Sequence, residues 1–303
     1  MNIRRDLGRI SLGLSGGAAK GLAHIGVLKA LEEFEIIPDV IAGTSAGALI
    51  GGLYARGISV NEMCELVKTV NVKKMAQLID LSFKRGFLID GKNIETFLSD
   101  IIGDVLIEDL PITFIATAVD INTGKGIYIK TGKLIDAIRA SISIPAVFKP
   151  VQANGTLYVD GGVRQNLPLS VLRDYKPDVL IGVNVLKNYH MVSDWESGGI
   201  LRDGDPNYKK RDDLWRSIKE IFEKDSKESD KMKLKASLVL SRTFSIIMSE
   251  LSEREIQSVA PDLVIPLDMR DIQLWDFWKG EMAVDLGYRQ SLPLIEKFLN
   301  SKE

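Results

Sequence analysis

The chain has 303 residues, of which 45% are hydrophobic and 26% charged, and its formal net charge is −2. This composition excludes a disordered chain and a bundle of membrane helices. The lack of an excess of basic residues argues against a nucleic-acid-binding protein. One cysteine excludes an internal disulfide, and two histidines offer little for a metal centre. Acid–base chemistry therefore depends mainly on carboxylates, lysines or the two imidazoles.

Neither a targeting signal nor a membrane span is predicted. Arg4, Arg5 and Arg9 are followed by a glycine-rich stretch and not by the apolar core of a signal peptide. The longest uncharged run, 40–55, has 16 residues and is interrupted by four glycines, whereas a spanning helix needs about 20 apolar residues. We therefore expect a cytoplasmic protein.

Strands and helices alternate in the first third of the chain. Ile10–Leu14 is a short apolar run that ends at a glycine pair, and apolar residues at helical spacing follow it as far as Leu31. Asp39–Ala42 is a second buried strand, followed by a turn and a helix over Ala46–Ala55. This alternation predicts sheet strands with covering helices.

The remaining elements are less regular. Residues 60–101 are predicted to be mostly helical, and a closing helix is expected at about 280–299. Further strands are expected at 112–119, 126–130, 157–160, 179–185 and 263–266.

Between Arg202 and Lys235, 20 of 34 residues are charged. This composition favours a solvated loop that leads into a long surface helix. A mobile flap over a site is the alternative, because Trp195, Trp215 and Phe222 are scattered through this part of the chain.

The most specific motif is Gly43-Thr44-Ser45-Ala46-Gly47, which lies between a predicted strand and a predicted helix. In that context the serine sits on a sharp turn, and its hydroxyl points outward at the start of a helix. The free N–H groups and positive partial charge of a helix N-terminus favour developing negative charge. A tight turn with a serine N-cap is the structural alternative.

A second glycine-rich segment, Ser15-Gly16-Gly17-Ala18-Ala19-Lys20-Gly21, also joins a strand to a helix. Consecutive small residues expose backbone N–H groups that can receive an anion. The segment lacks the G-K-[ST] ending of a phosphate loop and the middle glycine of the dinucleotide fingerprint. An oxyanion hole serving Ser45 is therefore preferred to a nucleotide-binding module.

The third segment runs from Asp160 through Gly161 and Gly162 to Pro168. An aspartate closes a predicted strand and enters a glycine turn. Alone this pattern is typical of a β-turn, but beside the other two segments Asp160 becomes a candidate base.

Together these motifs resemble those of the patatin-like phospholipases, in particular compact bacterial members. The succession S-G-G-A-A-K-G, G-T-S-A-G and D-G-G with a following N-x-P is similar to the family pattern, as is S-x-S-x-P-x-x-F-x-P at Ser141–Pro150. The resemblance covers about residues 8–186. It implies a three-layer α/β/α sandwich with a mainly parallel central sheet, and hydrolysis of lipid acyl esters by a Ser–Asp dyad.

The resemblance also implies residue roles. Ser45 is the expected nucleophile and Asp160 the expected base. The N–H groups of Gly16, Gly17 and Ala18, chiefly the last two, form the expected oxyanion hole, although some members have a third glycine where this chain has Ala18. The residues expected to support these motifs are Lys20, Gly21, Gly43, Gly47, Gly161 and Gly162.

A Ser–Asp dyad suits the composition, because it needs neither histidine nor cysteine. A serine hydroxyl is a poor nucleophile until a base accepts its proton, and a carboxylate can do so if partial burial raises its pKa. Ser45 would form an acyl-enzyme, and water activated by Asp160 would release the fatty acid. No metal or cofactor is expected.

The sequence offers other candidate sites and roles beside this dyad. A Ser45–Asp160–His190 triad has the chain order of α/β-hydrolases, but only two strands fit before Ser45 and His190 lies in an irregular polar stretch. His24 is expected to be a packing or capping residue, and Cys64 a structural thiol. A regulatory or scaffold protein without enzymatic function also stays open.

Substrate contacts are the hardest feature to predict. Lys20 and Arg164 are either helix-end or surface charges, or they attract a phosphate headgroup. The apolar residues between Met75 and Leu88 are either core or a lipid-facing lip flanked by basic residues. The expected partners are a lipid or fatty-acyl ester and, transiently, the inner face of the membrane. Acyl chain length, headgroup and oligomeric state are left open.

The whole chain, 1–303, is expected to form one domain. Its core motifs fall within 8–186, a charged flap or surface excursion covers about 187–235, and residues 236–303 supply C-terminal helical packing.

Overall fold

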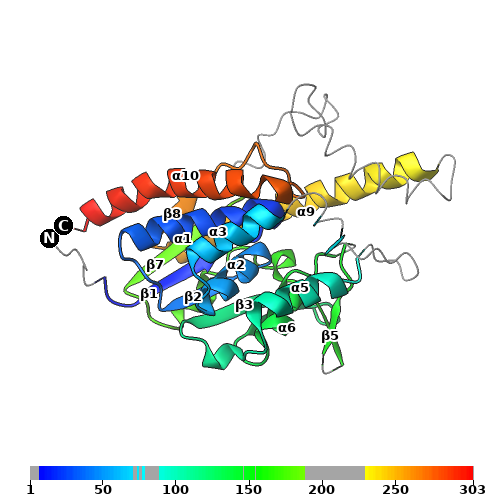
Figure 1. The fold of residues 1–303 in the computed structure, drawn as a ribbon, viewed down its shortest axis with the longest axis horizontal. Coiled ribbons are helices and arrows are strands. Elements are labelled where there is room, and N and C mark those ends of the chain that lie inside the picture. The colour runs from blue at the N-terminus through cyan, green and yellow to red at the C-terminus, as the bar shows by residue number, and fades with distance from the viewer. Residues whose placement is uncertain are drawn as a thin grey trace.

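A computed structural model describes residues 7–70, 74, 77–78, 89–145, 147–153, 155–187 and 229–302, with side chains from residue 242 onward in the last range. An eight-stranded sheet crosses the molecule, and helices pack against it (Figure 1). The predicted α/β class with a central sheet flanked by helices is confirmed.

Five strands form the parallel part of the sheet, in the order β3-β2-β1-β7-β8. They are β1 (Ile10–Leu14), β2 (Val40–Gly43), β3 (Thr113–Asp120), β7 (Val179–Asn184) and β8 (Leu263–Pro266). Each lies within one residue of its predicted bounds, because a short apolar run between turn residues is typical of a strand buried on both faces.

Three antiparallel strands extend the sheet beyond β3: β4 (Lys125–Ile129), β5 (Val151–Ala153) and β6 (Thr156–Asp160). The sequence predicted β4 and β6 but not β5, which has three partly exposed residues and no apolar run.

Strand β3 brings two distant strands together. Ala116 pairs with Gly43 of β2 and with Ile129 of β4, so β2 and β4 lie on opposite edges of β3. Ala118 pairs with Asp160 of β6 and with Ile127 of β4. Strands β2 and β6 therefore share one edge of β3, and their carboxyl ends meet there, two residues apart.

The two faces of the sheet carry alternate side chains. Ile41 belongs to one apolar cluster, whereas its neighbours Val40 and Ala42 belong to the other, as the period of two in a strand requires. The larger cluster includes residues of α1 (Ala23–Glu33), α2 (Ala46–Ala55), α3 (Val60–Thr69), α5 (Lys92–Ile102), α6 (Leu134–Ser141) and α10 (Gly280–Asn300). The smaller one lies under α7 (Ser170–Arg173) and the end of α9 (Ser229–Val259). The fold thus has three layers.

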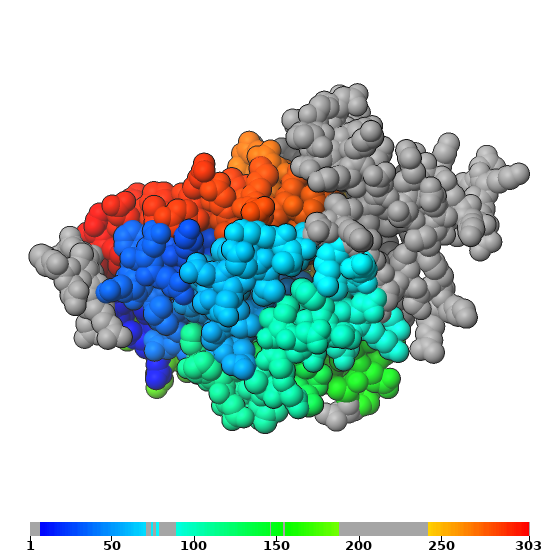
Figure 2. Space-filling view, in the orientation of Figure 1, coloured from blue at the N-terminus to red at the C-terminus, as the bar shows by residue number. Residues whose placement is uncertain are grey.

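Helices α1 and α10 pack at unusually close range. A Cβ on Gly287 would lie 2.1 Å from the Ala23 carbonyl oxygen, and one on Gly26 would lie 2.0 Å from that of Val284. Neither position accepts a larger residue without moving backbone. The segments from the two ends of the chain consequently form one continuous surface, blue against red in Figure 2.

Some expectations fall outside the described residues. The structure does not describe most of the proposed lip at 75–88 or most of the charged flap at 187–235. The long helix predicted after the charged stretch is α9, but Ser245, Met248, Ser249 and Ser252 on it are buried. Ile246 and Ile247 on the same part of α9 are exposed, so this part of the helix buries one face and leaves the other at the surface.

Candidate active site

Ser45 lies on a strained turn between β2 and α2. Its φ of 53° and ψ of −120° are unusual for a residue with a side chain. Gly47 must be a glycine, because a Cβ there would lie 2.3 Å from the Leu14 carbonyl oxygen of β1. The Ser45 N–H is donated to Ser141 Oγ at 2.8 Å. The turn thus holds Ser45 at the N-terminus of α2, where partial positive charge gathers.

Asp160 is fully buried at the end of β6. Its Oδ1 accepts the Gly162 N–H at 2.8 Å, whereas its Oδ2 has no hydrogen-bond partner of good geometry among the described residues. Burial raises the pKa of this carboxyl to about 7, and hydrogen bonding from Ser45 and from the Gly162 N–H opposes part of that rise. The carboxyl that faces Ser45 can therefore gain or lose a proton near neutral pH.

The junction of β2 and β6 explains why these two side chains meet. Thr117, between the paired residues of β3, shares a 2.7 Å hydrogen bond with the hydroxyl of Thr44. A Cβ on Gly161 would lie 2.1 Å from Thr117 Oγ1, so the first glycine after Asp160 is required by close packing.

The segment Ser141–Pro150 holds both halves of the pair. Ser141 at the end of α6 accepts the Ser45 N–H, and the Ser143 carbonyl accepts the Asp160 N–H at 3.0 Å. The Ser143 hydroxyl is in turn fixed by Arg139, whose guanidinium donates to it at 2.9 Å. The sequence motif was recognised, but this positioning role was not.

The glycine-rich loop after β1 presents backbone donors beside this pair. The Gly16 N–H is donated to the carbonyl and the side-chain oxygen of Asn166, both at 3.1 Å. Within the described part of the chain, the N–H groups of Gly17 and Ala18 donate to no other group. Ala18 has a φ of 48°, a left-handed conformation that alanine adopts at a cost. Two free donors therefore remain where three were expected.

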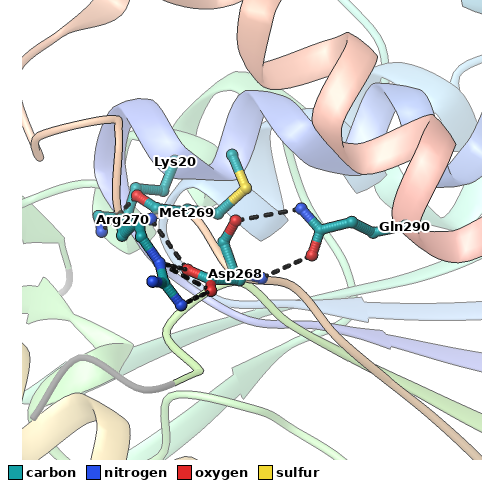
Figure 3. Close-up of polar contacts among 5 residues, drawn as sticks. All are labelled: Lys20, Asp268, Met269, Arg270 and Gln290. Atoms are coloured by element: carbon teal, nitrogen blue, oxygen red, sulfur yellow. Dashed lines mark hydrogen bonds and ion pairs between the residues drawn. The ribbon is translucent and has the colours of Figure 1, made fainter. Parts of the chain in front are cut away.

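Lys20 lies in the buried part of the same loop, in the 3-10 helix η1 (Ala18–Leu22). Its Nζ donates to the carbonyl of Met269 at 2.9 Å (Figure 3), and the Ala19 N–H donates to the Leu274 carbonyl at 2.9 Å. Burial lowers the pKa of Lys20 to about 8, and Asp268 opposes that change. Lys20 lies in the last turn of η1, so a helix-end charge fits the structure, whereas an exposed surface charge does not. Its contact with Met269 anchors the loop to the C-terminal segment.

The C-terminal segment that receives Lys20 is itself fixed. The backbone N–H of Asp268 donates to Gln290 Oε1 of α10 at 2.8 Å, and Gln290 Nε2 donates to the Asp268 carbonyl at 3.1 Å. The Asp268 carboxylate pairs with Arg270, as Figure 3 shows. Helix α10 thus supports the loop after β1 through a chain of polar contacts.

His24 is a buried packing residue, as predicted. Its Nε2 donates to the Ser15 carbonyl at 2.8 Å, since a carbonyl can only accept. Burial lowers the pKa of the imidazole to about 4, so the ring is neutral at pH 7. His190 lies outside the described residues, and the triad hypothesis stays untested.

The remaining candidates lie apart from the pair. Arg164 is exposed and contacts the Gly124 carbonyl at 3.4 Å. Cys64 is partly buried on α3, where burial raises the pKa of its thiol. Among the residues that the structure describes, no three His, Cys, Asp or Glu side chains gather as a metal site would require.

Comparison with known proteins gives the class of this fold and site. Residues 12–173 match the family model described as patatin-like phospholipase. That match covers more than half of the 303 residues, and the chain belongs to the patatin-like phospholipase family.

Named relatives extend the comparison. An "uncharacterized NTE family protein" of Mycobacterium tuberculosis is 36% identical over 201 residues, which are 66% of this chain and 53% of that protein. The "lysophospholipase nte1" of Emericella nidulans is 34% identical over 187 residues, which are 60% of this chain and 12% of that protein. The matches thus span about half, or less, of these relatives. The crystal structure of VipD from Legionella pneumophila aligns with a TM-score of 0.46 at 14% identity, over 95% of this chain and 66% of that one.

Each helix within the described ranges is too short or too polar to span a bilayer.

Proposed function

We propose that the protein hydrolyses carboxylic esters of lipids, with Ser45 as nucleophile and Asp160 as general base. The observation that carries the proposal is the meeting of a serine on a strained strand-to-helix turn with a buried carboxyl whose pKa is raised to about 7. A base with a pKa near the working pH is the most effective kind. Membership of the patatin-like phospholipase family supports a lipid as the substrate.

In the first step the Ser45 hydroxyl attacks the ester carbonyl carbon, and its proton passes to Asp160 Oδ2, which no other described residue bonds. The N–H groups of Gly17 and Ala18, with the N-terminus of α2, stabilise the oxyanion. The alcohol then leaves with the proton from Asp160, and an acyl ester remains on Ser45.

In the second step Asp160 takes a proton from a water molecule that attacks the acyl ester. The negative oxygen of the tetrahedral intermediate again accepts hydrogen bonds from the N–H groups of Gly17 and Ala18. Its collapse returns the proton to Ser45 and releases a fatty acid. A phospholipid or a lysophospholipid is the proposed substrate, and the relative named lysophospholipase favours this class.

The test is hydrolysis of chromogenic acyl esters and of lysophosphatidylcholine by the wild type, Ser45→Ala and Asp160→Asn. Removal of the nucleophile or the base is expected to lower kcat by at least about 10³-fold. Ser99→Ala, an exposed serine on α5, is the matched control and should keep the wild-type rate. Ester cleavage that survives Ser45→Ala would refute the nucleophile, and the absence of cleavage in every form would favour a scaffold protein.

The same assay decides between the dyad and the triad. His190→Ala is expected to keep the wild-type kcat, because the proposed proton transfer uses only Asp160. Loss of turnover in a folded His190→Ala protein would replace the dyad with a triad.

A further inference from the structure

Ser45 is nearly inaccessible in this structure, with 3% of its surface exposed, and Asp160 is fully buried. An ester cannot reach the hydroxyl unless some neighbouring group moves. The group that covers the pair therefore determines what enters, and its identity follows from the contacts around the two glycine turns.

Among the residues that the structure describes, the side chain that lies near both glycine turns is that of Met248 on α9. A Cβ on Gly16 would lie 2.8 Å from Met248 Cε and 3.1 Å from Ser45 Cβ. A Cβ on Gly162 would also lie 2.8 Å from Met248 Cε, and 3.1 Å from Asp160 Oδ1. The methyl group of Met248 thus lies between the loop of Gly16 and the loop of Gly162, a few ångströms from both reacting side chains.

The helix that carries Met248 is firmly attached beside the site. Ser252 Oγ accepts a hydrogen bond from Asn166 Nδ2 at 2.9 Å, and Ser249 Oγ donates to the Leu186 carbonyl at 3.1 Å. Glu255, one turn further, accepts the Ser170 N–H at 2.7 Å. Ser245, Ser249 and Ser252 lie on the buried face of this helix, and Met248 lies among them.

A methionine side chain can pack against the two glycine turns and can also change its conformation. It is unbranched, with three rotatable bonds, and adapts to neighbours of different shape. Rotation of the Met248 side chain would move its methyl group away from the two glycine turns, while the hydrogen bonds of Ser249 and Ser252 hold the helix in place. Because the thioether is apolar, it makes a better contact with an acyl chain than with a charged headgroup.

We propose that Met248 is a specificity-determining residue, and that the size of the side chain at position 248 sets which acyl esters reach Ser45. The inference rests on the proposed ester hydrolysis and deepens it. A smaller residue at 248 admits longer or bulkier acyl groups, and a larger, stiffer residue excludes them.

The experiment measures two ratios in Met248→Ala and Met248→Phe. One is kcat/KM for p-nitrophenyl palmitate over that for p-nitrophenyl butyrate. The other is the rate of Ser45 labelling by a long-chain fluorophosphonate over that by a short-chain one. We expect both ratios to rise about tenfold in Met248→Ala and to fall in Met248→Phe, since a side chain of this size in a pocket is worth about that much discrimination.

Met63→Ala is the matched control, because Met63 is as buried as Met248 but lies on α3, outside the site. It loses the same atoms from the core, so its ratios should stay at the wild-type value even if its Tm falls. Ratios in Met248→Ala that equal those of Met63→Ala would overturn the inference while Ser45 still reacts. Failure of Ser45 to react with either probe in any form would overturn the proposed function itself, and this inference with it.

Discussion

Two neighbouring strands, β1 and β2, each end in a glycine-rich turn, yet the two turns are held in different ways. The turn after β2 is held by the sheet and by α6, through the close contact of Gly47 with Leu14 of β1 and the hydrogen bond from the Ser45 N–H to Ser141. The loop after β1 is fixed from far along the chain, by Asn166 and by the C-terminal segment that receives Lys20. The turn of the nucleophile is thus held by the sheet and by α6, whereas the loop of the proposed oxyanion donors is held by Asn166 and the C-terminal segment.

The largest effect is expected from a substitution at Gly47, in the turn after β2. Gly47→Ala places a Cβ 2.3 Å from the Leu14 carbonyl oxygen, a backbone atom that cannot give way. We expect a loss of about 3 kcal/mol or more in the free energy of unfolding, measured by urea denaturation, with ester hydrolysis abolished.

Gly52→Ala on the same helix is the control. Its Cβ would meet only side-chain atoms, namely Ile138 Cδ1 at 3.0 Å and Leu134 Cδ1 and Phe114 Cζ at 3.3 Å. The better helix propensity of alanine offsets that crowding by up to about 1 kcal/mol. If Gly47→Ala unfolds at the same urea concentration as Gly52→Ala, the close packing of Gly47 against β1 does not fix the turn.

The rate of ester hydrolysis should depend on pH, because Asp160 must be ionised to accept the proton of the Ser45 hydroxyl. With a pKa of about 7 for that carboxyl, kcat/KM for a short ester should fall about tenfold per pH unit below 7 and level off above it. The measurement is a rate profile from pH 5 to 9 at constant ionic strength. A flat profile from pH 5 to 8 would contradict the role of Asp160 as base.

Stability should change with pH in the opposite direction. The folded state binds the Asp160 proton more tightly than the unfolded state, whose pKa is near 3.8. The resulting stabilisation is complete below 3.8 and disappears as the pH rises through about 7. The wild type therefore loses stability between pH 5 and 8, whereas Asp160→Asn, which has no carboxyl to titrate, does not. The free energy of unfolding of Asp160→Asn minus that of the wild type should rise by about 3 kcal/mol over this range.

The smallest expected effect concerns the loop that is held from a distance. Lys20→Met removes the hydrogen bond to the Met269 carbonyl and loosens the donors at Gly17 and Ala18. Because small displacements of positioned groups reduce rates steeply, we expect kcat to fall about tenfold with little change in KM, on neutral and phosphorylated esters alike.

Lys29→Met, an exposed lysine on α1, serves as the control. Loss confined to phosphorylated esters in Lys20→Met would instead restore the headgroup hypothesis and would weaken the contrast between the two turns.

The same contrast explains what the sequence could predict. The five parallel strands and the G-x-S-x-G turn have local signals, namely apolar runs and glycines at fixed spacing. The burial of Lys20 has none, because its partner Met269 is 249 residues away and a lysine in a glycine loop is normally exposed. Met248 was missed for a similar reason, since only the packing of α9 brings it near Ser45.

The position of β1 in the sheet bears on where this protein can be divided. β1 lies between β2 and β7, and β7 lies beyond residue 173, where the match to the family model ends. A fragment cut at that residue would leave one edge of β1 bare, the Ser15 N–H without the Val183 carbonyl, and α1 without α10. The stretch that defines the family is thus a unit of sequence similarity but not of folding, and expression trials that trim the chain to it should yield insoluble protein.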